Sequence, residues 1–187
     1  AKLGWVTYSG PMVSSDLGQS LSSFSAEWLW RMITSNPYPI ELTNPLAQPL
    51  QVFQPGSAEG VLIGGCLSLI TPLLGTAFMP DLKGAILIIE DVDEKTYRLD
   101  KQLQILRLHG VFDQIAGLIV GQFVNCFPSN PKRSFTVEDY LSNALKDTHF
   151  PVITNCAYGH LKQRFTIPIG IRARISTNPP RLTLLGL

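Results

Sequence analysis

Two apolar runs in the second half of the chain have the length and composition of strands buried on both faces. They cover residues 85–89 and 117–120 and read AILII and GLIV. Continuous apolar runs of this length are typical of strands in a parallel sheet that is covered on both sides. Between them, residues 96–109 place leucines at i, i+4 and i+7 on one helix face, and Gly110 ends the helix. The pattern predicts a β-α-β unit with parallel strands and a right-handed crossover.

Shorter elements are expected on both sides of this unit. The patterns indicate a strand over 59–63 that runs into Gly64-Gly65, a short helix over 67–74, a helix over 137–145 capped by Thr136, and a strand over 151–153. Three segments near the C-terminus, 166–169, 171–175 and 182–185, are spaced like an antiparallel meander. The fold class is therefore α/β, with a short parallel core and an antiparallel tail.

The first third of the chain has a different character. Residues 5–8 predict a strand, and Ser22 and Ser23 can cap a helix that Asn36-Pro37 stops. Five prolines then fall between positions 37 and 55, which favours an extended connection with short edge strands. We interpret residues 37–57 as a linker between 1–36 and a domain formed by 58–187.

Composition excludes several classes of function. With 187 residues, 16% charged residues and a formal net charge of +1, the chain predicts one main domain without a basic face for nucleic acid. No apolar run approaches the ~20 residues of a membrane helix, and the first residues lack the apolar stretch of a signal peptide. Cys66, Cys126 and Cys156 form no C-x-x-C pair, so we expect neither disulfides nor a metal site, and a reducing cytoplasm fits best. The start at Ala1, without Met, suggests a fragment or processed product.

Two titratable residues follow predicted parallel strands, where ligands of such sheets collect. Glu90 comes directly after the strand at 85–89, and His160 lies a few residues past the strand at 151–153. A glutamate bonded to one imidazole nitrogen leaves the other free to take a proton from a nucleophile. Each residue also has an ordinary interpretation, because Glu90 opens an acidic run of the kind found in solvated turns and His160 follows a turn glycine. Their separation of 70 positions carries no motif information.

Four sequence blocks carry a resemblance to a known family. Residues 86–94 read ILIIEDVDE and continue as TYRLDKQL at 96–103; the other blocks are GWVTYSGPM at 4–12, GVLIGGCLSL at 60–69, and YGH at 158–160 with PIG at 168–170. In this order they resemble the LD-carboxypeptidases and the related microcin immunity peptidases. The blocks span nearly the whole chain.

The resemblance implies a C-terminal "swivelling" β/β/α-type domain, preceded by the last strand and a docking helix of a nucleophile-bearing N-terminal domain. It implies a cytoplasmic serine peptidase of peptidoglycan recycling that cuts the L,D peptide bond of murein tetrapeptides and releases terminal D-Ala, without metal or other cofactor. Glu90 would be the orienting acid and His160 the general base. The family serine sits in a Gly-x-Ser-Asp turn, which this sequence lacks. We therefore expect the chain alone to be inactive.

Other assignments remain open at this stage. Ser14-Ser15-Asp16 contains Ser-Asp but lies in a polar loop without the strand-to-helix turn that would aim a nucleophile. Cys66 stands where the family pattern usually has Asn, and substrate-binding residues are not identified. Arg98 and Lys101 could hold a substrate carboxylate, although acidic neighbours favour surface ion pairs.

Alternative functions are a non-catalytic module that binds muropeptides or a partner protein, and a microcin-type peptidase for an acyl-nucleotide conjugate. The expected partners are the peptide substrate, the missing N-terminal domain and, through the aromatic cluster at Trp28 and Trp30, a second copy in a homodimer. Neither nucleic acid nor a membrane is expected as a partner.

Overall fold

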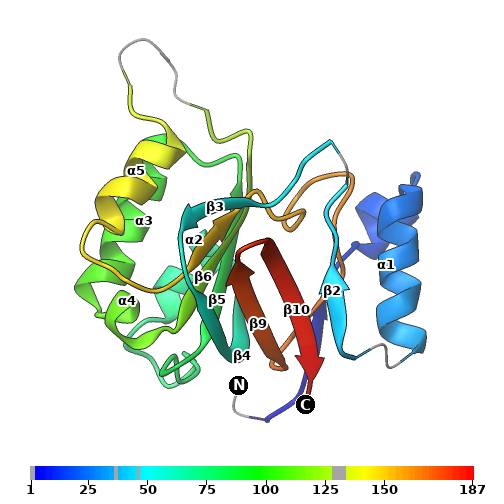
Figure 1. The fold of residues 1–187 in the computed structure, drawn as a ribbon. Coiled ribbons are helices and arrows are strands. Elements are labelled where there is room, and N and C mark those ends of the chain that lie inside the picture. Colours follow the sequence, from blue (N-terminus) through cyan, green and yellow to red (C-terminus); the bar gives the residue numbers. More distant parts are fainter. Residues whose placement is uncertain (1–2, 36–37, 46, 128–133) are drawn as a thin grey trace.

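The computed structural model describes residues 3–35, 38–45, 47–127 and 134–187. They form an eight-stranded mixed sheet in the order β2-β10-β9-β4-β5-β6-β7-β3 and a two-stranded sheet of β1 and β8 (Figure 1). The strands are β1 (Thr7–Ser9), β2 (Ile40–Leu42), β3 (Gln51–Gln54), β4 (Ser57–Cys66), β5 (Ile86–Val92), β6 (Gly117–Val124), β7 (Val152–Thr154), β8 (Ile167–Ile169), β9 (Arg172–Thr177) and β10 (Pro180–Gly186). The helices are α1 (Ser23–Thr34), α2 (Leu67–Ile70), α3 (Thr96–Leu108), α4 (Val111–Gln114) and α5 (Val137–Ala144), with a π-turn at Val13–Leu17 and a 3₁₀ turn at Thr71–Leu73.

The parallel half of the sheet confirms the β-α-β unit expected from the apolar pattern. Strands β4, β5, β6 and β7 run parallel, and α3 lies between β5 and β6 along the chain. Helices α2 to α5 cover one face, where Leu99, Leu103 and Leu106 of α3 are fully buried (Figure 1). Six consecutive residues of β5 are buried, which explains why this strand carries no alternating pattern.

A second hydrophobic core lies on the face of the parallel strands opposite to helices α2 to α5, and the antiparallel strands contribute to it. Ile86 and Ile88 of β5 belong to the same buried cluster as residues of β2, β9, β10 and α1. Helix α1 contributes Trp28 and Met32, and the rings of Trp28 and Phe165 pack in a T-shaped arrangement with 4.9 Å between centroids. Trp28 thus belongs to the core, whereas Trp30 is 56% exposed.

The structure corrects one expectation, confirms another and adds one element. Strand β8 pairs with β1, so only β9 and β10 form the expected antiparallel hairpin of the tail. The proline-rich stretch contains two short edge strands, as expected: β2 and β3 take the two opposite edges of the large sheet, where missing amide donors are tolerated. Helix α4 was not expected, because four residues are too few to show a helical period. The division into 1–36, 37–57 and 58–187 stays a prediction.

Helix ends follow local capping chemistry. The Ser22 hydroxyl accepts the amide of Ser25 at the start of α1, and Thr136 and Asp139 form a capping box on α5. The expected stop of α1 at Asn36-Pro37 lies outside the described residues.

Gly64 marks a close approach of two parallel strands. It pairs with Ile88 of β5 and has φ of 146°, and a Cβ there would lie 1.8 Å from the Ile88 carbonyl oxygen. Only a residue without a side chain fits, so β4 carries glycine at this position.

Gly64→Ala is expected to lower the free energy of unfolding by about 3 kcal/mol or more, because the methyl group meets backbone that cannot move without breaking the sheet. Gly75→Ala is the matched control, since Gly75 also has positive φ but has no atom within 4 Å of an added Cβ. Its cost should be about 1 kcal/mol, from backbone strain alone. Urea denaturation measures both; equal losses would contradict the close-approach explanation.

Candidate active site

Glu90 lies near the carboxyl end of β5, at an irregularity in the pairing with β6. Ile89 pairs with Val120 but Asp91 pairs with Phe123, so β6 carries one extra residue opposite Glu90. Such a bulge alters the direction of nearby side chains and is common beside active sites. Glu90 is only 4% exposed, so the acidic run begins inside a buried strand rather than in the solvated turn that its composition suggested.

The structure brings His160 into contact with this carboxylate. Nδ1 of His160 lies 2.8 Å from Oε2 of Glu90, across a separation of 70 residues in the chain. The contact assigns the proton on Nδ1 to the bond with Glu90 and leaves Nε2 unprotonated in the neutral ring. The His160 side chain is 38% exposed, while that of Glu90 is 5% exposed. The imidazole therefore has one side held by protein and another accessible.

Two glycines make room for the Glu90 side chain. A Cβ on Gly159 would lie 2.6 Å from Oε2 of Glu90, and one on Gly121 would lie 3.2 Å from its Cβ and 2.5 Å from the Tyr158 carbonyl oxygen. Gly159 also has φ of 118°. A larger residue at either position would push the carboxylate or the histidine loop away.

Burial raises the pKa of Glu90 above its usual value, and the hydrogen bond from His160 acts in the opposite direction. Removal from water disfavours the ionised form, whereas a donor stabilises it. The hydrogen bond from His160 is thus the largest contribution that favours the ionised form of this carboxylate.

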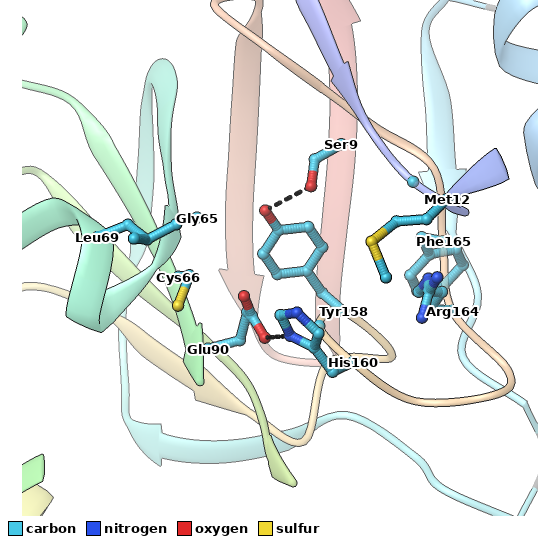
Figure 2. Close-up of a pocket in the computed structure, with 12 residues that line it drawn as sticks. Ser9, Met12, Gly65, Cys66, Leu69, Glu90, Tyr158, His160, Arg164 and Phe165 are labelled. Atoms are coloured by element: carbon cyan, nitrogen blue, oxygen red, sulfur yellow. Dashed lines mark hydrogen bonds and ion pairs between the residues drawn. The ribbon is translucent and has the colours of Figure 1, made fainter. Parts of the chain in front are cut away.

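Glu90 and His160 line a cavity of about 270 Å³ (Figure 2). The turn from β4 to α2 forms one wall, and the segment after β1 together with residues following His160 forms the opposite wall. The lining residues are Ser9, Gly10, Met12, Gly65, Cys66, Leu69, Glu90, Tyr158, Gly159, His160, Arg164 and Phe165. The cavity lies at the carboxyl edge of the parallel strands, where sequence reasoning expected ligands to collect.

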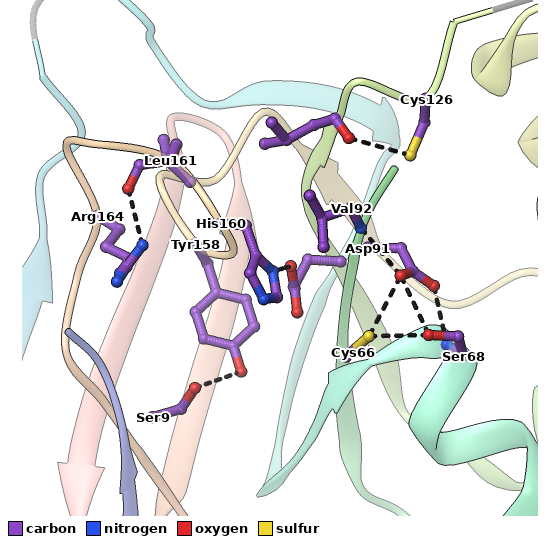
Figure 3. A network of polar contacts seen from close by, with 12 residues as sticks. Ser9, Cys66, Ser68, Asp91, Val92, Cys126, Tyr158, His160, Leu161 and Arg164 are labelled. Atoms are coloured by element: carbon purple, nitrogen blue, oxygen red, sulfur yellow. Dashed lines mark hydrogen bonds and ion pairs between the residues drawn. The ribbon is translucent and has the colours of Figure 1, made fainter. Parts of the chain in front are cut away.

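Tyr158 connects the cavity to β1, a role that the sequence did not reveal. Its hydroxyl donates a hydrogen bond of 3.0 Å to Oγ of Ser9 (Figure 3). Burial raises the pKa of Tyr158 to about 12, so this phenol is neutral and acts as a donor at ordinary pH. The tyrosine directly precedes Gly159-His160, and it anchors the histidine segment against the N-terminal strand.

Asp91, the residue after Glu90, ties together the wall formed by the turn from β4 to α2. Its carboxylate accepts hydrogen bonds from the backbone amide of Ser68 at 2.8 Å, the Ser68 hydroxyl at 3.2 Å and the thiol of Cys66 at 3.2 Å (Figure 3). Burial raises the pKa of Cys66, which favours the thiol over the nucleophilic thiolate. Cys66 therefore lines the cavity as a hydrogen-bonded thiol and is a poor nucleophile.

The remaining sequence candidates lie elsewhere. Ser14 and Ser15 are exposed in the π-turn and do not line the cavity. Arg98 on α3 is 3.5 Å from Glu94, with 57% of its side chain exposed, as expected for a surface ion pair. In the described ranges no helix is both long and apolar enough to cross a membrane. Nor do these ranges contain a group of three or more His, Cys, Asp or Glu side chains that could hold a metal ion.

Comparison with known proteins identifies the family. Residues 59–175 match the LD-carboxypeptidase C-terminal domain. The chain is 36% identical over 178 residues to the probable murein peptide carboxypeptidase of Bacillus subtilis, covering 93% of this chain and 54% of that protein. It is 25% identical over 211 residues to the microcin C7 self-immunity protein of Escherichia coli, covering 98% of this chain and 60% of that protein. The crystal structure of muramoyltetrapeptide carboxypeptidase from Oxalobacter formigenes superimposes with a TM-score of 0.84 at 29% identity, over 98% of this chain and 62% of that one.

The matched relatives are carboxypeptidases and a microcin self-immunity protein, and the chain shares a mixed α/β fold with the solved carboxypeptidase. The chain belongs to the LD-carboxypeptidase family, and the matched region is that family's C-terminal domain. It spans a little over half the length of the curated relatives described above.

The raised pKa of Tyr158 predicts a specific loss of stability in alkali. A phenol whose pKa rises from 10.0 to about 12 on folding contributes stability that is present below pH 10 and is lost as the pH rises through 12. Tyr158→Phe lacks this contribution. The free energy of unfolding of the parent, relative to that of Tyr158→Phe, should therefore fall by up to about 2.7 kcal/mol over this range.

Unfolding free energies of both proteins between pH 8 and 12 measure the difference. Tyr97→Phe, which removes an exposed tyrosine from α3, is the control for the loss of a phenol as such. Parallel pH profiles for the parent and Tyr158→Phe would show that Tyr158 does not titrate as a buried phenol.

Proposed function

We propose that this chain provides the glutamate and histidine of a Ser-Glu-His triad in a serine-type LD-carboxypeptidase. The observation that carries the proposal is the 2.8 Å contact between Nδ1 of His160 and the buried carboxylate of Glu90, on the wall of an open cavity. In this assignment Glu90 orients the imidazole and stabilises its protonated form, and Nε2 of His160 is the general base. The printed sequence lacks a Gly-x-Ser-Asp turn, so the proposed nucleophile is a serine from a region of the whole protein outside these 187 residues.

The proposed reaction needs only these three groups and preorganised donors. Nε2 takes the proton of the serine hydroxyl as the oxygen attacks the peptide carbonyl, and then gives it to the departing amino group. A water molecule attacks the resulting ester in the second half of the cycle, and its proton again passes through Nε2. The hydrogen bond to Glu90 holds the ring in the required tautomer in both halves.

The proposed substrate is a murein tetrapeptide, from which terminal D-Ala is released during peptidoglycan recycling in the cytoplasm. The support is the identity of 36% to a probable murein peptide carboxypeptidase, against 25% to the microcin C7 self-immunity protein. The latter match makes an acyl-nucleotide conjugate the alternative substrate. A non-catalytic module for muropeptides is the alternative from a different class, and a homodimer remains a prediction.

Activity of the chain by itself tests the origin of the nucleophile. We expect no release of D-Ala from murein tetrapeptide and no labelling by a serine-directed phosphonate. Both should appear when the serine-bearing segment is added in trans or fused in front of the chain. Hydrolysis by the 187 residues alone would contradict the proposal that the serine lies outside them.

Substitution of the pair tests its role in the active form. Glu90→Gln and His160→Gln are each expected to reduce kcat by a factor of about 10³ to 10⁴, with little change in KM. His160→Gln removes the general base, and Glu90→Gln removes the charge that orients the imidazole and stabilises its protonated form. His109→Gln is the matched control: His109 is exposed and bonded to the Ile105 carbonyl at the end of α3. Full activity of either pair variant would exclude the triad, and faster cleavage of an aminoacyl sulfamoyl adenosine than of tetrapeptide would select the alternative substrate.

A further inference from the structure

The segment that carries His160 is held in place mainly from the N-terminal part of the chain. Residues 159–166 form neither helix nor strand, and they connect β7 to β8 through a series of bends. Their polar contacts to other parts of the chain include Glu90 on one side and residues of the segment 16–25 on the other. The family match begins at residue 59, so these N-terminal contacts lie outside it.

Arg164 makes the central contact. Nη1 donates a hydrogen bond of 3.1 Å to the carbonyl of Leu161, the residue after His160 (Figure 3). Nη2 donates to the carboxylate of Asp16 in the π-turn, and the Arg164 side chain is only 10% exposed. The same Asp16 oxygen accepts the backbone amide of Met12 at 2.7 Å. The guanidinium thus joins the peptide next to His160 to a carboxylate that is itself held by backbone.

Two serines at the start of α1 hold the next part of the loop. The hydroxyls of Ser22 and Ser25 both donate to the carbonyl of Lys162, at 2.9 and 3.0 Å. Oγ of Ser25 also accepts the backbone amide of Arg164 at 2.9 Å. Because Ser25 is completely buried, this contact is shielded from water. The loop after His160 is therefore fixed at consecutive points to one turn and one helix end.

We infer that Arg164, oriented by Asp16, is a positioning residue that sets the imidazole of His160 against Glu90. Its guanidinium bonds the Leu161 carbonyl and the Asp16 carboxylate, so it acts on His160 through the Leu161 peptide. An arginine suits this task, because its planar fork can donate to two acceptors in a fixed arrangement. Lysine can neutralise Asp16 but presents a single nitrogen for both acceptors. Calling the effect catalytic rests on the proposed function, whereas the geometric claim concerns His160 and Glu90 alone.

Arg164 also lines the cavity, which raises a competing role as the cation for a substrate carboxylate. In the structure its guanidinium is already engaged by a carboxylate and a carbonyl of the protein. A substrate-binding arginine would alter KM when replaced, while a positioning residue alters the state of His160 even without substrate. The two roles are therefore separable by experiment.

The primary measurement is the Nδ1 proton of His160 in ¹⁵N-histidine-labelled chain, assigned by its absence in His160→Gln. In the parent we expect Nδ1 to be the protonated nitrogen, with slow proton exchange because of the bond to Glu90. Arg164→Gln and Asp16→Asn should each speed this exchange by a factor of about ten or more and increase the share of the other tautomer. Arg164→Lys should restore part of the parent behaviour, because it keeps the charge opposite Asp16.

Arg181→Gln is the matched control, because Arg181 pairs with Glu41 at 2.9 Å on an exposed part of the sheet. It removes an arginine from an ion pair and should leave His160 unchanged. Backbone amide spectra establish that each variant is folded; if Arg164→Gln does not fold, Asp16→Asn decides. An unchanged Nδ1 proton in the folded variants would overturn the proposal, whatever the peptidase assays show.

Kinetics of the active form give the second measurement. A positioning role predicts a fall in kcat of at least about tenfold for Arg164→Gln with KM nearly constant. A rise in KM alone would instead assign Arg164 to the substrate carboxylate and overturn the proposal. Failure of the proposed function would appear as inactivity of the parent even with the serine-bearing segment present, while the His160 signal is unaffected.

Discussion

The site depends on keeping one carboxylate out of water while giving it a single strong donor. An ionised carboxylate in a poorly hydrated position is costly unless a partner compensates for the lost water. Glu90 meets this condition through Nδ1 of His160 at 2.8 Å. Gly121 and Gly159 are needed for this contact, because a Cβ at either position would lie too close to Glu90 or to the neighbouring backbone. Bulge, loop and cavity are arranged around this contact.

Strand β4 joins the parallel and antiparallel halves of the large sheet beside the cavity. Its first half, through Val61, pairs antiparallel with β9, and its second half, from Leu62 to Cys66, pairs parallel with β5. Cys66 pairs with Glu90 across the ladder, so the turn into α2 begins beside the buried carboxylate. The antiparallel half meanwhile shares its core with α1, whose first turn holds the loop after His160. The packing of the two hydrophobic cores, one on each face of the sheet, therefore affects the positions of Glu90 and His160.

The sequence predicted those parts of the fold that depend on local pattern. The parallel β-α-β unit, α1, α5 and the hairpin β9-β10 follow from apolar spacing, caps and turn residues. The pairing of β1 with β8 could not be read in this way, because it joins segments about 160 residues apart and neither segment specifies its partner. Glu90 and His160 were found by their places after strands and by resemblance, but their contact required coordinates. The contacts of Tyr158, Asp91 and Arg164 could not be read from the sequence, since each residue acts through a partner distant in the chain.

The pairing of β1 with β8 also has a consequence for the order of assembly during synthesis. A ribosome makes Glu90 some 70 residues before His160, and the strand that closes onto β1 only after that. Until then the carboxylate has no imidazole, and β1 has no partner on this side. Contacts of such long range close slowly, because the chain between their ends must first be ordered. The nascent chain therefore carries Glu90 without its histidine partner until the segment from His160 to β8 has been made.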